Sequence, residues 1–349
     1  MSERTIRAAV VGASGYTGAE LLRILLGHPH AELVAVTSRQ YAGQRLGEVF
    51  PRFRGLPGSA LEFVEPTTAA LVAAGAEVAF LALPHGVAVD YAPGLLDAGI
   101  RVIDLSADFR LRDPALYAEF YGAAHPAPEL LAEAVYGFPE VRAEEIRAAR
   151  LIAAPGCYPT SISLPLIPLL RAGLLDPCSI VTCSMSGVSG AGKKAEPTLM
   201  FCECQESLRA YGVPKHRHLA EIEQELGIAA GRPVTISFTP HLVPVLSGIC
   251  TTSSALLAPG ATPEQIGAAL QQAYGAAPFV RLLGMGGCPD TKHVTRTNFL
   301  DIGWNYDPRT GRVLLLSAED NLGKGAGGQA IQCLNLAFDL PETAGLLRA

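Results

Sequence analysis

The stretch Gly12-Ala13-Ser14-Gly15-Tyr16-Thr17-Gly18 decides the fold of the first part of the chain. It follows the apolar run Arg7–Val11, which is typical of a buried strand, and opens the helical pattern Gly18–Leu26. Glycines at such a turn let the backbone approach a pyrophosphate, and N–H groups at a helix start attract anions. The spacing is G-x-x-G-x-x-G rather than the commoner G-x-G-x-x-G. A tight turn that binds nothing is the alternative, but the position in the first strand–helix unit favours dinucleotide binding, with Ser14 and Thr17 as hydroxyl donors.

The first third of the chain continues this alternation of strands and helices. Strands are predicted at Leu33–Thr37, Val78–Leu83 and Arg101–Leu105, and helices at Thr67–Ala74 and Val89–Asp97. The βαβ alternation predicts an α/β fold, a Rossmann-like doubly wound parallel sheet with right-handed crossovers.

Beyond Cys157 the pattern favours an α+β domain with a mostly antiparallel sheet. A helix is predicted at Thr160–Ala172, with Pro165 and Pro168 interrupting it. The strands predicted next are Ser179–Cys183, Val234–Pro240, Gly248–Leu257, Phe279–Leu283, Asn298–Trp304 and Arg312–Ser317. The remaining helices are predicted at Leu219–Leu226, Pro263–Tyr274 and Gly327–Phe338.

Composition excludes several classes of protein. The 349 residues are 49% hydrophobic and 17% charged, which rules out intrinsic disorder and leaves room for two domains. Lys+Arg 27 against Asp+Glu 33 gives a net charge of −6, without the basic clusters that nucleic acid or an anionic membrane would require. The first apolar run ends at Gly12, too soon for a signal-peptide core. We therefore expect a soluble cytoplasmic protein that binds neither nucleic acid nor membrane.

The eight cysteines do not form a metal or disulfide pattern. No C-x-x-C occurs, and the closest pair, Cys202-Glu203-Cys204, is spaced too tightly for usual zinc ligands. We expect no metal. Cys157 alone has a turn-to-helix setting, and the other seven are assigned to packing.

The end of the second predicted strand indicates the cofactor. NAD sites commonly place Asp or Glu there to hold the ribose hydroxyls. Here the strand ends in Thr37-Ser38-Arg39, and a serine with an arginine suits a 2′-phosphate. The residues therefore predict NADP, with a solvated loop position for Arg39 as the alternative.

Two segments could supply a nucleophile and its base. Cys157 lies in Ala154-Pro155-Gly156-Cys157-Tyr158-Pro159-Thr160, just ahead of a predicted helix whose start would lower the thiol pKa. From this context alone, a buried structural cysteine is an equal alternative. In the segment Lys215–Glu223, His218 and Glu221 share a helix face, so that the carboxylate could orient the imidazole. His216 is the second candidate base, and a surface position is the alternative for either histidine alone.

Three further loops carry residue types suited to anions or a cofactor. Arg110 follows a predicted strand end and could clamp a phosphate or carboxylate with its planar fork. The loop Ser186–Lys194 is rich in glycine and serine and ends in two lysines without the Walker A order. The glycines after Asp320 permit a close backbone approach, and His85 follows another strand as a cofactor-side or ordinary loop residue.

Taken in order along nearly the whole chain, these motifs resemble the N-acetyl-gamma-glutamyl-phosphate reductase family. Its members are NADPH enzymes of arginine biosynthesis, and they share their architecture and covalent cysteine with aspartate-semialdehyde dehydrogenase. The matching motifs are Gly12–Gly18, Thr37-Ser38-Arg39, Leu83–Gly86, Leu105–Arg110, Ala154–Thr160, Ser186–Ala195, His216–Glu223 and Asn321–Gly328.

The resemblance implies roles for single residues. Cys157 would be the nucleophile, Arg110 would meet the substrate phosphate, and His218, with His216 as second choice and Glu221 beside it, would be the acid/base. The implied cofactor contacts, together with neighbours in the same motifs, are Gly12, Ser14, Gly15, Tyr16, Thr17, Gly18, Ser38, Arg39, Pro84, Ser189, Gly190 and Asn321. The further substrate contacts expected in these motifs are Ser186, Lys194 and Arg217.

The resemblance also implies a mechanism and an assembly. The Cys157 thiolate would attack an acyl phosphate, expel phosphate and leave a thioester for reduction to the aldehyde. We expect an NADP-binding domain over 1–156 and 321–349, a catalytic and oligomerisation domain over 157–320, and a homo-oligomer, either dimer or tetramer. The alternatives are a reductase of aminoadipyl phosphate or aspartyl phosphate, or a non-catalytic NADP-binding sensor.

Overall fold

The computed structural model describes residues 4–347. The chain forms two compact units. Unit 1 comprises Met1–Pro155 and Ala326–Ala349, and unit 2 comprises Gly156–Gly325. The chain therefore leaves unit 1 immediately before Gly156 and returns to it after Gly325.

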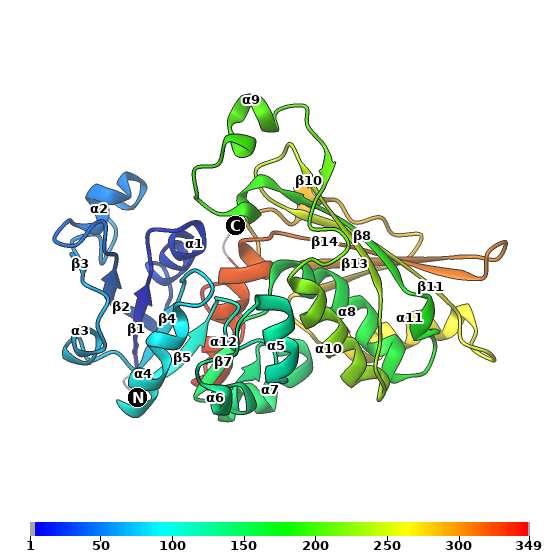
Figure 1. The fold of residues 1–349 in the computed structure, drawn as a ribbon, viewed down its shortest axis with the longest axis horizontal. Helices are drawn as coiled ribbons and strands as arrows, with labels where there is room; N and C mark the ends of the chain where they lie inside the picture. The colour runs from blue at the N-terminus through cyan, green and yellow to red at the C-terminus, as the bar shows by residue number, and fades with distance from the viewer. Residues whose placement is uncertain (1–3, 348–349) are drawn as a thin grey trace. The chain divides into compact units, whose positions relative to one another are not determined.

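Unit 1 contains a sheet of seven parallel strands in the order β3-β2-β1-β4-β5-β7-β6, which confirms the predicted doubly wound sheet (Figure 1). The strands are β1 (Ile6–Val11), β2 (Ala31–Thr37), β3 (Phe63–Val64), β4 (Val78–Leu81), β5 (Arg101–Asp104), β6 (Val135–Tyr136) and β7 (Leu151–Ala153). All residues of β4 are buried, as expected for a parallel strand covered on both faces.

The helices of unit 1 are α1 (Tyr16–Leu25), α2 (Leu46–Val49), α3 (Thr68–Ala73), α4 (Ala92–Asp97), α5 (Pro114–Tyr121), α6 (Pro128–Glu133), α7 (Pro139–Ala148) and α12 (Gly328–Ala337). Every residue of α12 is buried, and the helix packs against α1 and α7. The single helix predicted at Val89–Asp97 is wrong in one respect. A 3-10 turn, Ala88–Asp90, precedes α4, because Pro93 lacks the N–H that a continuous helix would need.

Unit 2 contains a mixed sheet in the order β12-β13-β14-β11-β8-β10-β9. Only the β8/β10 and β12/β13 pairs are parallel, which confirms a mostly antiparallel sheet. The strands are β8 (Val181–Gly187), β9 (Arg209–Ala210), β10 (Ser237–Val243), β11 (Ile249–Leu256), β12 (Val280–Met285), β13 (Leu300–Asp307) and β14 (Arg312–Glu319).

Helices pack on one face of this sheet. They are α8 (Cys157–Arg171), α10 (His218–Ala230) and α11 (Pro263–Tyr274), while the short α9 (Phe201–Cys204) lies apart from them (Figure 1). Ser184 and Thr251 share a hydrogen bond of 2.8 Å, and Thr251 bonds Ser161 of α8 at 2.9 Å, so these strand positions face the helices. The alternate positions of β8 face the other way, and Val181 and Met185 there are 50% and 42% exposed.

The helix α8 runs through both of its internal prolines, so the predicted interruption is wrong. Pro165 and Pro168 lack the N–H groups that would bond the carbonyls of Ser161 and Leu164. Hydroxyls from other elements replace those donors. Ser317 Oγ of β14 donates to Ser161 O at 2.7 Å, and Tyr274 Oη of α11 donates to Leu164 O at 2.7 Å.

The assignment of seven cysteines to packing is wrong for three of them. Cys333 is buried in α12, whereas Cys178, Cys202 and Cys288 are exposed. Cys178 lies in the 3-10 turn Pro177–Ser179, Cys202 in the short α9 and Cys288 in a loop after β12. All eight thiols are free.

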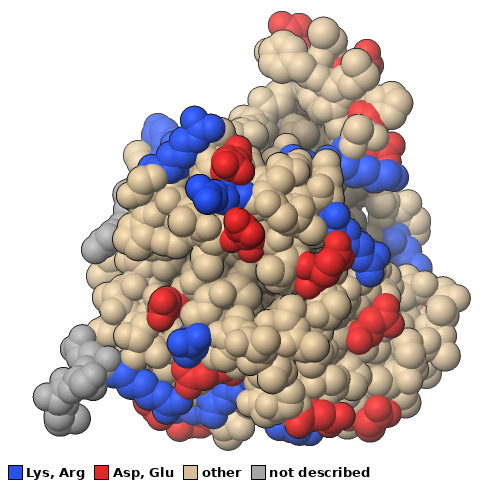
Figure 2. Space-filling view, turned by 90° about the vertical axis from the view of Figure 1, so that its left-hand side faces the viewer, with Lys and Arg blue, Asp and Glu red and all other residues tan. Residues whose placement is uncertain are grey.

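The surface of the molecule carries charges of both signs. Lys and Arg side chains are interspersed with Asp and Glu on the face shown in Figure 2. Within residues 4–347, no helix is both long and apolar enough to cross a membrane. In the same residues, no group of three or more His, Cys, Asp or Glu is arranged to hold a metal ion.

Candidate active site

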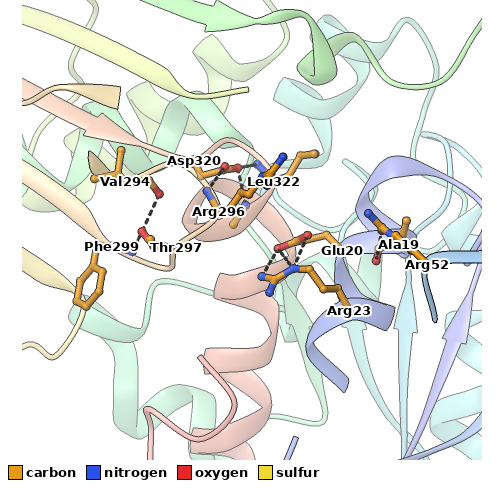
Figure 3. A network of polar contacts seen from close by, with 11 residues as sticks. Ala19, Glu20, Arg23, Arg52, Val294, Arg296, Thr297, Phe299, Asp320 and Leu322 are labelled. Atoms are coloured by element: carbon orange, nitrogen blue, oxygen red, sulfur yellow. Dashed lines mark hydrogen bonds and ion pairs between the residues drawn. The ribbon is translucent and has the colours of Figure 1, made fainter. Parts of the chain in front are cut away.

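The glycine-rich turn of unit 1 forms a close-fitting cradle at the carboxyl edge of the sheet. Gly12 has φ +78°, and a Cβ there would lie 2.5 Å from Ala82 O, so only glycine fits. Gly15 precedes α1 with extended backbone, and no side chain caps the first N–H groups of the helix. The first turn of α1 contains no acidic residue, and Glu20 further along the helix pairs with Arg23 (Figure 3). The helix start therefore offers N–H donors and a positive dipole end to a pyrophosphate.

The residues expected to read the 2′-phosphate lie beside this turn. Ser38 is buried, and its Oγ lies 3.4 Å from Ser14 Oγ. Arg39 is exposed, and its Nη2 donates to Tyr91 Oη at 3.3 Å. Tyr16 and Thr17 open α1 and are accessible, as is Pro84 beyond β4, while Gly18 packs against Ala13. In unit 1 the structure thus gathers a dinucleotide fingerprint, a serine and an arginine at one edge, and these residue types fit NADP.

Arg110 supports the backbone that leads to Cys157. It is 7% exposed, and its Nε donates to Ala154 O at 2.9 Å while Nη2 donates to Leu105 O at 3.0 Å. Two donors of its fork are thus committed to carbonyls, and the expected contact of Arg110 with a substrate phosphate or carboxylate stays a prediction. Burial, then the charge of Asp108, raises the pKa of the nearby Asp104 to about 7.

Another part of this edge is organised by Asp108. Its carboxylate accepts from the N–H groups of Gly86 at 2.6 Å and Val89 at 3.2 Å. It also lies 2.9 Å from His85 Nδ1, and the His85 ring stacks on Tyr121. The loop after β4 is therefore fixed by a buried carboxylate from the loop after β5.

In unit 2, Cys157 is the first residue of the fifteen-residue helix α8. Gly156 caps that helix with extended backbone, and the first turn contains no acidic residue. The positive end of the α8 dipole therefore favours a thiolate at Cys157. The side chain is partly exposed and lines a pocket, so the alternative of a buried structural cysteine does not describe it.

His218 and Glu221 hold Gly156 from two sides. A Cβ at position 156 would lie 2.6 Å from His218 Nε2, so the imidazole packs directly on the residue before Cys157. Glu221 Oε2 accepts from Gly156 N at 3.0 Å. This hydrogen bond fixes the turn before Cys157, and the orientation of the imidazole by the buried Glu221 carboxylate stays a prediction.

His216 differs from His218 in its role. Burial, then the charge of Arg217, lowers the pKa of His216 to about 4. Its Nδ1 accepts from the backbone N–H of His218 at 3.1 Å. A neutral ring that accepts at Nδ1 is suited to positioning His218, so the geometry favours His218 as the proton carrier.

A cavity of about 440 Å³ brings these residues together. It is lined by Cys157, Tyr158, Ser186, Gly190, Ala191, Leu199, Arg209, Tyr211, Gly212, Lys215, His216, Arg217, His218 and Leu242. Of the expected substrate contacts it includes Ser186 and Arg217. Lys194 does not line it, because that side chain is 79% exposed and pairs with Glu196. The expected contact with Lys194 is therefore not supported in this structure.

The expected cofactor contacts in unit 2 form a cluster of their own. Asn321 Oδ1 accepts from Gly248 N at 2.8 Å, and its Nδ2 donates to Ser189 Oγ at 3.0 Å. The next residue back, Asp320, accepts from the N–H groups of Arg296 and Leu322 and fixes that turn (Figure 3). Asn321 therefore anchors the loop that carries Ser189 and Gly190.

Sequence reasoning missed several lining residues. The sequence indicates no role for Tyr158, and it gives no reason to choose Leu199, Arg209, Tyr211 or Leu242. The segment between β8 and α10 has no strand or helix periodicity, so its local sequence does not indicate that Tyr211 lines the pocket. The backbone bond from Tyr211 N to Pro240 O at 3.1 Å, which brings it back, joins residues 29 positions apart.

Comparison with known proteins places the chain in a family. The family model "Semialdehyde dehydrogenase, NAD binding domain" matches residues 7–149, and "Semialdehyde dehydrogenase, dimerisation domain" matches residues 157–321. A curated protein of Akkermansia muciniphila named N-acetyl-gamma-glutamyl-phosphate reductase is 65% identical over 98% of this chain and 99% of the relative. The chain belongs to the N-acetyl-gamma-glutamyl-phosphate reductase family. A reductase of the same name from Geobacter metallireducens is 49% identical over 98% of both chains.

Solved structures of lower sequence identity share the fold of this chain. Aspartate semialdehyde dehydrogenase II from Vibrio cholerae aligns with a TM-score of 0.73 at 18% identity, over 96% of this chain and 99% of that one. The enzyme from Candida albicans, solved with NADP, aligns with a TM-score of 0.71 at 18% identity, over 95% of this chain and 98% of that one. The predicted resemblance to the reductase family and its fold class is thus confirmed.

Proposed function

We propose that this chain reduces N-acetyl-γ-glutamyl phosphate with NADPH to N-acetyl-L-glutamate 5-semialdehyde and phosphate, in arginine biosynthesis. The observation that carries the proposal is the placement of Cys157 at the start of α8, with His218 packed on Gly156 beside it. This arrangement suits a nucleophilic cysteine with an adjacent acid/base, on a chain 65% identical to a curated reductase of that name.

The first half of the reaction forms a thioester on Cys157. The sulfur attacks the acyl carbon, a C–S bond forms, and the bond to the phosphate oxygen breaks. His218 carries the proton from the thiol to the departing phosphate. The backbone N–H of Cys157, at the start of α8, is placed to stabilise the oxyanion.

The second half regenerates the thiol. Bound NADPH supplies the hydride that reduces the thioester carbonyl. Collapse of the resulting oxyanion breaks the C–S bond and releases the aldehyde, and the Cys157 thiolate takes a proton again. We assign NADP binding in unit 1 to the turn Gly12–Gly18 together with Ser38 and Arg39. We expect NADPH to bind more tightly than NADH.

The reverse reaction tests this function. With the aldehyde N-acetyl-L-glutamate 5-semialdehyde, NADP and inorganic phosphate, we expect NADPH formation that stops when phosphate is withheld. The aminoadipate analogue of the aldehyde should react at least ten times more slowly. Faster turnover of that analogue would identify an aminoadipyl-phosphate reductase instead, and NADP binding without turnover would indicate a sensor protein.

The dimerisation-domain match also indicates an oligomer. We propose a cytoplasmic homodimer that pairs through the sheet face of unit 2 opposite α8. That face carries the exposed Val181 and Met185 and the partly exposed Leu314 and Leu316. Pairing two such faces would remove this apolar surface from water.

A further inference from the structure

We propose that Tyr211 selects the N-acyl group of the substrate, by donating its hydroxyl proton to the acyl carbonyl oxygen. This inference rests on the proposed function and adds to it a residue that distinguishes an acylated amino acid from the free amine. It is carried by the pairing of two tyrosine hydroxyls in the wall of the pocket and by the charges around them.

The tyrosine pair joins two segments at the pocket. Tyr158 follows Cys157 in the first turn of α8 and is 1% exposed. Tyr211 follows β9 and is tied to β10 by its backbone bond to Pro240 O. Their hydroxyl oxygens lie 2.8 Å apart, a normal hydrogen-bond distance. The pair is therefore one residue from the nucleophile and faces the same cavity.

The direction of that hydrogen bond leaves a proton on the pocket side. A fully buried hydroxyl has no access to water and needs an acceptor in the protein. At 2.8 Å either hydroxyl can be the donor. We assign the donor role to Tyr158, because its side chain is the more deeply buried of the two. Tyr211 then keeps its own O–H for a ligand.

Tyr211 also stays protonated under the conditions of catalysis. Burial raises its pKa to about 12, so the hydroxyl is a donor at neutral pH. An amide carbonyl oxygen is a good acceptor for such a donor, whereas an ammonium group can accept no hydrogen bond.

The charges around the pocket also favour an acylated substrate over one with a free amine. Arg209, Lys215 and Arg217 line it, and among its described lining residues none is Asp or Glu. The nearby Glu221 bonds the backbone of Gly156. Cationic side chains attract the carboxylate and the acyl phosphate of the substrate, but they repel a free ammonium. Acylation removes that positive charge and supplies the carbonyl that Tyr211 can bind.

An oxygen-to-sulfur exchange in the substrate tests the contact directly. We compare N-acetyl- with N-thioacetyl-L-glutamate 5-semialdehyde in the phosphate-dependent reduction of NADP, because sulfur is the weaker acceptor. For the wild-type protein we expect kcat/KM to fall about tenfold on the exchange, since tenfold corresponds to about 1.4 kcal/mol, the scale of one hydrogen bond. A ratio near one for the wild type would overturn the proposal without any variant.

In the variant Tyr211→Phe, kcat/KM for the acetyl substrate should fall about tenfold. The exchange of the acyl oxygen for sulfur should change kcat/KM of this variant little. Tyr306→Phe, which removes a hydroxyl from β13 outside the pocket lining, should keep the wild-type ratio. An unchanged ratio in Tyr211→Phe would show that Tyr211 acts only through the fold. Complete lack of phosphate-dependent turnover in the wild type would reject the proposed function instead.

Binding of the product analogues provides a readout independent of turnover. N-acetyl-L-glutamate should bind the wild-type protein at least ten times more tightly than L-glutamate, which carries a free ammonium. Equal affinities for the two would contradict the selection against a free amine.

Discussion

At the scale of single residues, the structure assigns the reacting groups their positions through their neighbours. Turn chemistry and helix spacing are local properties, so the sequence indicates Cys157 and His218 as candidates, and the family resemblance implies their roles. The sequence did not predict that Glu221 bonds Gly156, because that contact joins residues 65 positions apart. Nor did it show that Arg110 donates to the carbonyl of Ala154, and so supports the backbone that enters the active-site turn.

Gly156 is where this positioning can be tested. In Gly156→Ala the added methyl would lie 2.6 Å from His218 Nε2, so either the imidazole or the Cys157 turn must move. A misplacement of reacting groups by about 1 Å can cost about a hundredfold in rate. We therefore expect kcat of the variant to fall about a hundredfold while NADPH binding persists. Gly227→Ala, in the same helix as His218 but with ordinary contacts, is the control. A variant at 156 with wild-type kcat would argue against this packing.

The two histidines should separate by variant and by pH. We expect His218→Asn to lower kcat by about a hundredfold or more, the usual contribution of an acid/base. His216→Asn keeps an acceptor for the His218 N–H and should retain activity within about tenfold. The reverse order of losses would make His216 the proton carrier.

The lowered pKa of His216 also predicts a dependence of stability on pH. The unfolded chain binds this proton near pH 6.5 and the folded chain only near pH 4, so stability is lost as the pH falls between those values. Urea unfolding at pH 7 and pH 5 should show a smaller loss of unfolding free energy for His216→Asn than for the wild type. Equal losses would mean that other groups cause the acid sensitivity.

At the scale of elements, α8 shows why local sequence rules predicted an interruption that the helix does not have. Its prolines predict an interruption, and the donors that compensate for them come from Ser317 and Tyr274, more than 100 positions away. Most strands and helices were predicted because their periodicity is local. The position of the segment that carries Tyr211 was not predicted, because tertiary contacts fix it and its sequence has no regular periodicity.

Removing one of these donors should weaken the fold. Tyr274→Phe leaves the buried carbonyl of Leu164 without the hydroxyl, and we expect a loss of about 1–3 kcal/mol in the free energy of unfolding. Denaturant unfolding of Tyr274→Phe beside Tyr306→Phe measures this. Equal stability of the two variants would show that α8 does not need the bond from α11.

At the scale of the whole molecule, the expected cofactor contacts come from both units, and the cysteine pocket is lined by residues of unit 2. The net charge of the chain is −6, but the pocket is lined by Arg209, Lys215 and Arg217, which suit an anionic substrate. Neither the pocket nor the exposed sheet face could be predicted from composition, because both depend on which strands become neighbours.

The proposed dimer is testable on that face. Met185→Glu places a charge at a 42% exposed position of β8 and should convert the dimer to monomer at micromolar concentration. Val72→Glu, at a 49% exposed position of α3, should leave the mass unchanged. Light scattering after size exclusion measures both, and a dimer of Met185→Glu would place the interface elsewhere.

The covalent role of Cys157 is the central claim, and one comparison tests it most directly. Phosphate-dependent reduction of NADP by N-acetyl-L-glutamate 5-semialdehyde is measured for the wild type and for Cys157→Ser, with the Kd for NADPH measured on the same samples. We predict that the variant loses turnover while its Kd stays within about twofold of the wild-type value. Turnover of Cys157→Ser near the wild-type rate would contradict a thioester on this cysteine.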